Sequence, residues 1–537
     1  MNATTTPHTP RERRAATLVM ACVGVFVAYL PVTTVSVSLP AVQRALNAST
    51  AQLSWVSDAF VLPMAALILT AGVFGDVHGR KKVYQAGLAL SGLGALVALS
   101  AHSVQVLWIG QALAGIGSAA LLPTTLALIS HAVPDPRERA AFIGLWATAL
   151  SAALALGPVL AGLVLEHASW RWIYLPTVPA SLLAMAFAAR LLTDSRAPGG
   201  RRLDWPGQIT AALAITALVY GIIEGGAGSF SDALVVTALT VAAVSAAAFV
   251  LAERRSDAPM LDLTLFRSPA FTATTLIAMI SFLGMIGFFF ALSLYFGLVQ
   301  RLSTLDAAWR LLIVAAVPLL LGAPVGRLTH RVSPRLLIPG GLLAVTAALL
   351  TLTGIDATTS YAALSWRLAL LGLGMALVIT PMTATAVGAV PFRQAGMAAA
   401  GNNAFRQVGA ALGPAVLGAL LSTRAVGALP GHLTDAGLAA PVVRRVTAVA
   451  QDGGIGAVGA VDLGADTPRM LAALSASFLD GLHLCLLVAA ALTLLAAAVG
   501  AVLLRAPRAT AAGQDTGPGR TTGPRSADDG TPAPARV

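Results

Sequence analysis

Long apolar stretches, separated by short polar connections, recur along most of the chain. An α-helix needs roughly 20 residues to cross a hydrocarbon core about 30 Å thick, and fourteen stretches approach or exceed this length. Apolar residues run continuously within them instead of alternating, which favours helices over a β-barrel. The pattern predicts an all-α integral membrane protein with 14 transmembrane helices. Their expected spans are 16–40, 53–74, 83–101, 105–130, 140–165, 172–192, 207–224, 232–251, 271–298, 308–328, 335–353, 361–389, 396–422 and 477–504.

The composition agrees with this pattern. The chain is 57% hydrophobic and 11% charged, whereas soluble domains are about 25% charged. The first apolar stretch follows "RERR" but is longer than a secretory signal, so we expect a retained helix. Cys22 and Cys485 each lie inside an apolar stretch, where a free cysteine acts as a small hydrophobe. We therefore infer neither a disulfide nor a metal site from them, and we expect no cofactor.

Lysine and arginine are distributed unequally between the two sets of connections. The set on the N-terminal side carries 24 of them and the other set carries 9, with Arg406 inside a span. Positive charge favours the cytoplasmic side, so we expect a multi-pass plasma-membrane protein with both termini in the cytoplasm. The same bias explains the net charge of +11 without nucleic acid as a partner.

Three segments recur in the same order at nearly one offset. "GVFGDVHGRK" from 72 resembles "GRLTHRVSPR" from 326, "WIGQALAGIGSAALLPTT" from 108 resembles "WRLALLGLGMALVITPMT" from 366, and "ALALGPVLAG" from 153 resembles "GAALGPAVLG" from 409. Transporters are often built from duplicated halves. The repeat predicts two pseudo-symmetric six-helix bundles plus an inserted helix pair. The expected parts are a cytoplasmic segment 1–15, a first bundle 16–192, a linker with the inserted pair 193–270, a second bundle 271–504 with an extracytoplasmic loop 424–476, and a disordered tail 505–537.

Six motifs together carry a family resemblance. They are "GVFGDVHGRKK", "LALGPVLAG", "SWRWIYLPTVP", "RRLDWPG", "ERRSDAPMLDLTLFRSPAF" and "AGMAAAGNNAFRQVGAALGPAVLG". The chain resembles the major facilitator superfamily, in its fourteen-helix drug:proton antiporter branch. The resemblance implies a secondary exporter of drugs, toxic compounds or natural products that exchanges them for protons by alternating access. It also implies a non-enzymatic protein, which we expect to be a monomer in contact with membrane lipid.

Two positions depart from that branch. Its first helix usually carries an aspartate where this chain has Pro31, and its fourth helix an arginine where this chain has Gln111. Either charge alone in a membrane would be costly, so their joint absence is consistent with mutual loss. This departure keeps open a uniporter, or a differently coupled transporter, of a neutral or anionic metabolite. A non-transporting membrane sensor is the alternative from another class.

The remaining polar groups inside spans are candidate functional residues. Asp58 in the second helix is the candidate proton-coupling residue, and a water-exposed carboxylate at a cavity mouth is the alternative. Glu224, at the end of an inserted helix, is expected in a solvated interfacial role. In the thirteenth helix, helical spacing places Asn402, Asn403, Arg406 and Gln407 on one face. With Gln111, these four are candidate substrate-cavity residues; a purely structural hydrogen-bond network is equally open.

Two further sets concern conformational change. In the loop after the second helix the resemblance implies a cytoplasmic gate that latches the two halves, although Val77 replaces one usual arginine. The candidates are Gly72, Gly75, Asp76, Gly79, Arg80 and Lys81, and holding topology and touching anionic lipid is the alternative role. The steps Gly157-Pro158 and Gly413-Pro414 are candidate helix bends, with close packing as the alternative.

Overall fold

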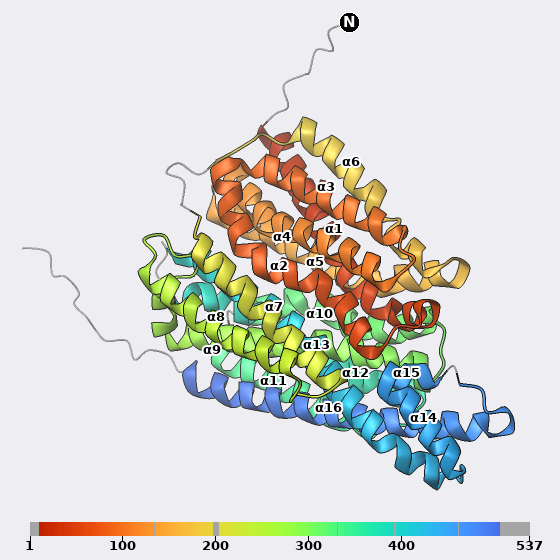
Figure 1. Cartoon of the computed structure of the whole chain (residues 1–537). Helices are drawn as coiled ribbons and strands as arrows, with labels where there is room; N and C mark the ends of the chain where they lie inside the picture. Colours follow the sequence, from red (N-terminus) through yellow and green to blue (C-terminus); the bar gives the residue numbers. More distant parts are fainter. Residues whose placement is uncertain are drawn as a thin grey trace, which may run out of the picture. The chain divides into compact units, whose positions relative to one another are not determined.

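Helices make up most of the described residues. The structure is a computed structural model of the 537 residues, and it describes residues 10–133, 135–196, 203–329, 331–390, 394–459 and 461–504. The described residues contain no strand, and 14 of their helices are long and apolar enough to cross a membrane. The predicted fold class and number of spans are confirmed (Figure 1).

The long helices have these bounds: α1 Pro10–Leu46, α2 Thr50–His78, α3 Arg80–Leu99, α4 Val104–Ala132, α5 Pro136–His167, α6 Thr177–Leu191, α7 Trp205–Ala227, α8 Ala233–Arg255, α9 Pro269–Leu294, α10 Thr304–Leu328, α11 Pro334–Leu352, α12 Tyr361–Gly388, α13 Ala395–Asp435 and α16 Thr467–Leu503. Shorter elements are 3-10 turns at Trp170–Tyr174, Leu263–Arg267 and Gly464–Asp466, a π turn at Tyr295–Val299, and helices α14 Ala440–Gly453 and α15 Ile455–Val458.

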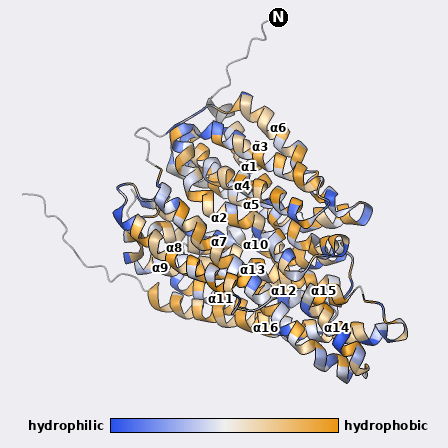
Figure 2. Cartoon of the chain, in the orientation of Figure 1, coloured by the Kyte–Doolittle hydropathy of each residue, from blue (hydrophilic) through white to orange (hydrophobic). Residues whose placement is uncertain are grey.

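Local sequence signals set where the helices begin. Ser49 and Gln52 form a reciprocal capping box that starts α2. Ser268, followed by Pro269, starts α9 in the same way, with its hydroxyl accepting from the N–H of Phe271. Apolar residues fill the helix interiors and polar residues collect near the helix ends (Figure 2). Such short start signals explain why adjacent spans are joined by few residues.

The two six-helix bundles pack alike. In the first bundle α1 contacts α4, α5 and α6, α2 contacts α4, and α3 contacts α4 and α6. The second bundle repeats every one of these contacts with α9, α10, α11, α12, α13 and α16 in the places of α1 to α6. The pair α7 and α8 is the insertion, and α7 contacts both α2 and α13. The sequence repeat therefore corresponds to a real structural pseudo-symmetry.

The connection 424–476, for which the sequence predicts no particular structure, is largely helical. In it α13 continues to Asp435, α14 and α15 follow, and α16 already begins at Thr467. The hydropathy falls after about residue 422 although the backbone stays helical, since Ala- and Leu-containing segments keep a high helix propensity. The predicted tail 505–537 lies outside the described residues.

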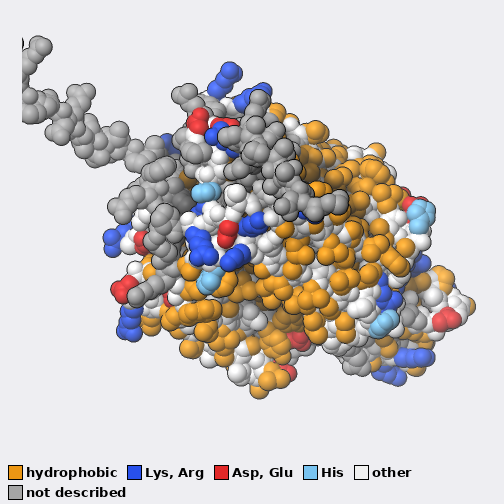
Figure 3. Space-filling view, turned by 90° about the horizontal axis from the view of Figure 1, so that it is seen from above, with side chains coloured by type: hydrophobic (Ala, Val, Ile, Leu, Met, Phe, Trp, Pro, Cys, Tyr) orange, Lys and Arg blue, Asp and Glu red, His pale blue; other side chains and the backbone are white. Residues whose placement is uncertain are grey.

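The connections define two faces of the molecule. We call the face where α1 begins the basic face; it carries Gly79 and the connections 133–135, 192–204, 256–268, 329–333 and 389–394. The opposite face carries the connections 47–49, 100–103, 168–169, 228–232, 300–303, 353–360 and 436–466. In Figure 3 charged side chains gather toward two ends of the view and leave a broad apolar band between them. This distribution suits a protein whose middle is surrounded by lipid.

Candidate functional site

The seam between the two bundles is the place where a transport site can form. It is built mainly from two equivalent helix pairs, α2 with α13 and α5 with α10, together with α1 and α9. Each pair joins a helix of one bundle to a helix of the other. The seam therefore has the same pseudo-two-fold arrangement as the bundles.

The seam is tightly packed near the opposite face. Ser54 Oγ on α2 donates to the carbonyl of Pro414 on α13 at 3.4 Å, and Ser293 Oγ on α9 donates to the carbonyl of Val37 on α1 at 3.4 Å. A Cβ added to Gly162 of α5 would lie 2.6 Å from the Cα of Leu305 on α10. No side chain fits between α5 and α10 at this point, so the two backbones are in direct contact.

Within the described residues, neither Gly144 of α5 nor Gly322 of α10 makes such a contact near the basic face. Gly144 lies 18 residues before Gly162 on α5, which is five helical turns, so both glycines are on the same side of the helix. A Cβ at Gly144 would have no atom within 4 Å, and the same is true of Gly322 on α10. Five of the six residues 143–148 are exposed. Between α5 and α10 the seam is therefore closed toward the opposite face and open toward the basic face.

The short helix α15 and the inserted helix α7 cover the closed end of the seam. The short helix α15 of the second bundle places Gly456 directly against the side-chain amide of Gln43 on α1, and Gly454 next to Thr50. In the turn before α16, the N–H of Gly464 and the hydroxyl of Thr467 donate to Asp462 and lower the pKa of that carboxyl. On the insertion, the carbonyl of Gly226 accepts from Thr423 Oγ1 of α13 at 3.0 Å. These elements strengthen the closure.

Asp58 lies inside the closed part of the seam. It is one helical turn from Ser54 on the same face of α2, the face that contacts α13. The side chain is fully buried, and neither carboxylate oxygen has a hydrogen-bond partner among the described residues. The alternative of a water-exposed carboxylate does not hold in this conformation.

Arg406 lies on α13 at the middle of the seam. Its Nη2 donates to Thr383 Oγ1 on α12, and its guanidinium carbon lies 5.4 Å from the centre of the Phe282 ring on α9. The Nε atom is buried without an acceptor, while the residue as a whole is partly exposed. Arg406 and Asp58 form no ion pair in this structure.

The other candidates on α13 point to different neighbours. Gln407 Nε2 donates across the seam to the hydroxyl of Tyr29 on α1 at 3.0 Å. Asn402 Nδ2 donates to the carbonyl of Thr274 on α9 at 3.3 Å, and its Oδ1 has no partner in the described structure. Asn403 is partly exposed. The four residues share a region but only Gln407 bonds to the other bundle.

Gln111 is a buried helix-packing residue. Its Nε2 donates to the carbonyl of Val56 on α2 at 3.3 Å, so it holds α4 against α2 inside the first bundle. Glu224, at the end of α7, accepts a hydrogen bond of 3.0 Å from the indole of Trp55 on α2. Its carboxylate is partly exposed, in keeping with an interfacial position.

The charged segment around Gly79 is tied to the first bundle and is not the expected loop, because α2 runs to His78 and α3 begins at Arg80. Arg80 Nη2 pairs with Asp76 at 2.8 Å and Arg80 Nη1 bonds to the carbonyl of Ala127 on α4. Lys81 Nζ donates at 2.7 Å to two carbonyls at the end of α6. Gly79 has a φ of 115°, a conformation that favours glycine. Gly72 and Gly75 of the same segment pack against α4.

Both Gly-Pro steps lie where a bundle packs most closely. The space at Gly157 is filled by Thr33 of α1, whose neighbour Thr34 also donates to the carbonyl of Gly157 at 3.3 Å. The space at Gly413 is filled by the backbone N of Gly287 on α9, at 2.7 Å from an added Cβ. Close packing is therefore one role of these steps, and α5 and α13 continue as helices through Pro158 and Pro414.

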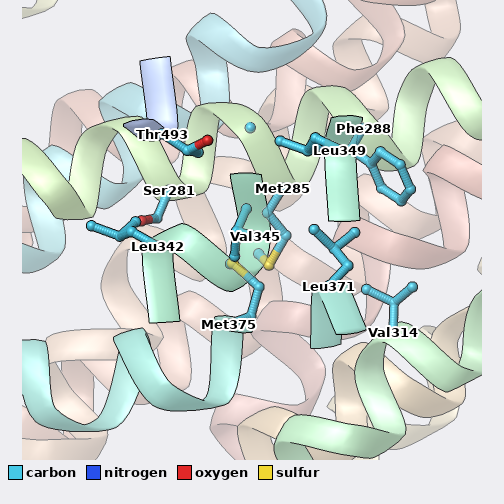
Figure 4. A pocket seen from close by; sticks show the side chains of 11 residues that line it. Ser281, Met285, Phe288, Val314, Leu342, Val345, Leu349, Leu371, Met375 and Thr493 are labelled. Atoms are coloured by element: carbon cyan, nitrogen blue, oxygen red, sulfur yellow. The ribbon is translucent and has the colours of Figure 1, made fainter. Parts of the chain in front are cut away.

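A separate small pocket lies inside the second bundle. Its lining comes from α9, α10, α11, α12 and α16 and is almost wholly apolar, with Ser281 and Thr493 as its polar members (Figure 4). Met285 and Met375 point toward each other across it. The pocket holds no charged residue and contains none of the candidates on α13, so it is distinct from the polar part of the seam.

Sequence reasoning missed three residues of the seam: Tyr29, Thr383 and Phe282. Each is an ordinary residue of an apolar helix, and its part in the seam depends on which helices pack together. The only signal was positional: Tyr29 lies two residues before Pro31, where the family pattern usually has its aspartate.

Comparison with known proteins agrees with this architecture. The family described as Major Facilitator Superfamily matches residues 21–414. The multidrug resistance protein Stp of Mycobacterium tuberculosis is 33% identical over 432 residues, 80% of each chain. The tetracenomycin C resistance and export protein of Streptomyces glaucescens is 30% identical over 501 residues, 92% of this chain and 93% of the relative. The multidrug efflux pump LfrA of Mycolicibacterium smegmatis is 31% identical over 505 residues, 93% and 98% of the two chains.

A solved structure shares the fold. The bacterial homolog of the human lysosomal transporter Spinster, in an inward-facing and unoccupied conformation, aligns with a TM-score of 0.63 at 15% identity, covering 92% of this chain and 99% of that one. The family match covers more than half of the chain, and the three relatives are at least 30% identical. The chain belongs to the major facilitator superfamily, a family of membrane transporters.

Proposed function

We propose that the protein exports amphipathic drugs or natural products across the plasma membrane in exchange for protons, with Asp58 as the residue that carries the proton. Export is supported by the relatives, whose names describe multidrug efflux and antibiotic resistance. The excess of lysine and arginine on the basic face supports a cytoplasmic position for both termini. The open end of the seam then faces the cytoplasm, where an exporter collects its substrate.

The state of Asp58 carries the proton-coupling proposal. A charged carboxylate that is buried without any donor is strongly disfavoured, so the protonated form suits this closed packing. Arg406, Tyr29, Tyr220 and Glu224 are charged or titratable groups on helices around the seam, and neither carboxylate oxygen of Asp58 has a hydrogen-bond partner among the described residues. The exchange requires Asp58 to take up its proton from outside when α2 and α13 separate at the opposite face, and to give it to water that reaches it from the basic face. Proton uptake and opening of that helix pair are thereby coupled.

In the proposed cycle the two bundles move and a latch controls which face is open. The two bundles, taken as 16–192 and 271–504, rock against each other around the seam, while the inserted pair in 193–270 contacts both. Asp76 and Arg80 are paired with each other in this conformation. In the outward-open state, we propose that they latch the first bundle to the second at the basic face.

The test is transport by the purified protein in proteoliposomes with an imposed pH gradient, using Asp58→Asn and the control Glu224→Gln. The expected result is gradient-driven export by the wild type and the control, and no gradient dependence in Asp58→Asn. Undiminished gradient-driven export by Asp58→Asn would exclude this carboxylate as the coupling group.

The same assay examines uniport, the second candidate. It is favoured by one observation: Gln111, at the position where the related branch has an arginine, is a neutral residue already bonded to Val56. Substrate movement that is unaffected by the pH gradient in the wild type would establish this alternative. No movement of cationic, neutral or anionic compounds would favour a non-transporting sensor.

A further inference from the structure

Arg406 is a cation without a counter-ion in the membrane-spanning region. No carboxylate of the described residues lies within ion-pair distance of it. Its neighbours Thr383 and Phe282 offer one hydroxyl oxygen and one aromatic face, neither of which carries a charge. A cation at this depth normally pairs with an acidic group or lines a watery cavity. The structure therefore leaves one negative charge to be supplied.

The acidic side chains that could have supplied it are placed elsewhere. Glu224 accepts from Trp55 at the end of α7, and Asp480 on α16 pairs with His432 at 3.0 Å. Asp58 is sealed against α13 by the packing around Ser54. Internal neutralisation of Arg406 would require one of these contacts to break.

The surroundings of Arg406 offer further groups to a ligand. Its Nε donor is buried without an acceptor, although the residue is partly exposed. Tyr29 is bonded to Gln407, the residue that follows Arg406 on α13. Its hydroxyl oxygen accepts from Gln407, which leaves the hydroxyl hydrogen able to donate. The Phe282 ring adds an apolar surface beside the charge. An anion with an aromatic or apolar body fits this combination.

We propose that Arg406 is the anchoring residue of the substrate site and that the exported compound carries an acidic group, such as a carboxylate or a phenolate, on an apolar aromatic body. The guanidinium binds the anion, Tyr29 donates a second hydrogen bond, and Phe282 contacts the apolar part. This inference rests on the proposed export function and specifies its substrate class. Since Gln407 and Tyr29 join the two bundles at the same place, the bound anion also touches both bundles.

The test is equilibrium binding of three probes with one carbon skeleton to the full-length protein in lipid nanodiscs. The probes are naphthoate, naphthylmethanol and naphthylmethylammonium, which are anionic, neutral and cationic. We expect the wild type to bind naphthoate about tenfold or more tightly than naphthylmethanol, as charge-assisted hydrogen bonds predict. Arg406→Gln should lose this preference, whereas Arg406→Lys should keep part of it.

Arg424→Gln is the matched control, because Arg424 lies on the same helix but is exposed near the opposite face. It should bind naphthoate like the wild type, and all variants should show the thermal unfolding of folded protein. Naphthoate binding that is absent from the wild type, or no weaker in Arg406→Gln, would overturn the proposal. Gradient-driven export of naphthylmethylammonium but not naphthoate would also overturn it while leaving proton-coupled export intact.

Discussion

Gly162 and Gly144 lie on the same side of α5, yet a Cβ added to the first would meet the backbone of α10 and one added to the second would meet no atom within 4 Å. The glycines differ only in which end of the seam they occupy. The same helix pair is thus closed at the opposite face and open at the basic face. A rigid helix in contact at one end and free at the other implies rotation of whole bundles, since local side-chain movement cannot open only half of a helix pair.

The difference between the two ends of the seam predicts that a cross-link at the closed end stops transport. In a background without Cys22 and Cys485, we propose the pair Ser54→Cys and Gly418→Cys, which joins α2 to α13. A Cβ at Gly418 would lie 2.7 Å from Ser54 Oγ, close enough for a disulfide. Oxidation should lower transport in proteoliposomes about tenfold or more, because the bundles can no longer separate there. Reduction should restore it.

The control is a cross-link of similar geometry within one bundle. A Cβ at Gly92 of α3 would lie 3.2 Å from the Cβ of Ser181 on α6, and both helices belong to the first bundle. Gly92→Cys with Ser181→Cys should transport equally well oxidised and reduced. Normal transport by the oxidised Ser54 and Gly418 pair would show that the closed end does not open during the cycle.

Valine substitutions at Gly162 and Gly144 should have different effects on stability. Gly162→Val forces a side chain into the backbone of α10, and overpacking of this kind costs about 1–3 kcal/mol. It should destabilise the present conformation, seen as a lower unfolding temperature of the purified protein. Gly144→Val adds the same side chain where nothing is within 4 Å, so this conformation should keep its stability.

The transport rates of the two variants should differ as well. If the basic end closes during the cycle, Gly144→Val meets α10 only in the closed form and should slow transport without lowering stability. Equal unfolding temperatures for Gly162→Val and Gly144→Val would contradict the asymmetry of the seam.

Sequence reasoning reached the fold because helix number and repeat depend on local hydropathy and on residues such as Pro123 and Pro381 that recur at fixed spacing. It also selected Asp58 and Arg406 as candidates, since charges inside apolar helices are conspicuous in any sequence. It could not find Tyr29 or Thr383, nor the contrast between Gly144 and Gly162. These depend on which helices pack together and on the conformation adopted, and local sequence patterns predict neither.

Hydropathy also failed to predict where α13 ends. Residues 424–435 lose the continuous apolar character of a span, so hydropathy ended the helix too early, while the backbone hydrogen bonds continue to Asp435. The short helix α15 contacts Gln43 of the first bundle, and no sequence pattern predicts this contact.

The third prediction concerns the middle of the seam, where the closed and open parts meet. Tyr29→Phe removes the acceptor of the hydrogen bond from Gln407, which is the bond that joins α1 to α13. A neutral hydrogen bond contributes about 1 kcal/mol, so the balance between the two conformations should shift about fivefold toward the outward-open form. Spin labels at Gly144→Cys and Gly322→Cys, in the background without native cysteines, would report the shift as a larger population with a short distance between α5 and α10.

Tyr84→Phe provides the comparison, because Tyr84 donates to the carbonyl of Met20 and both residues belong to the first bundle. Losing that bond should lower stability in both conformations alike, so the distance distribution should not change. If Tyr29→Phe left the distribution unchanged as well, the Gln407 bond would be a passive contact, and the equilibrium would be set by the backbone packing at Gly162 and Gly418 alone. A shift in Tyr29→Phe only would place the pivot of the movement at the level of Arg406, where a bound anion could influence it directly.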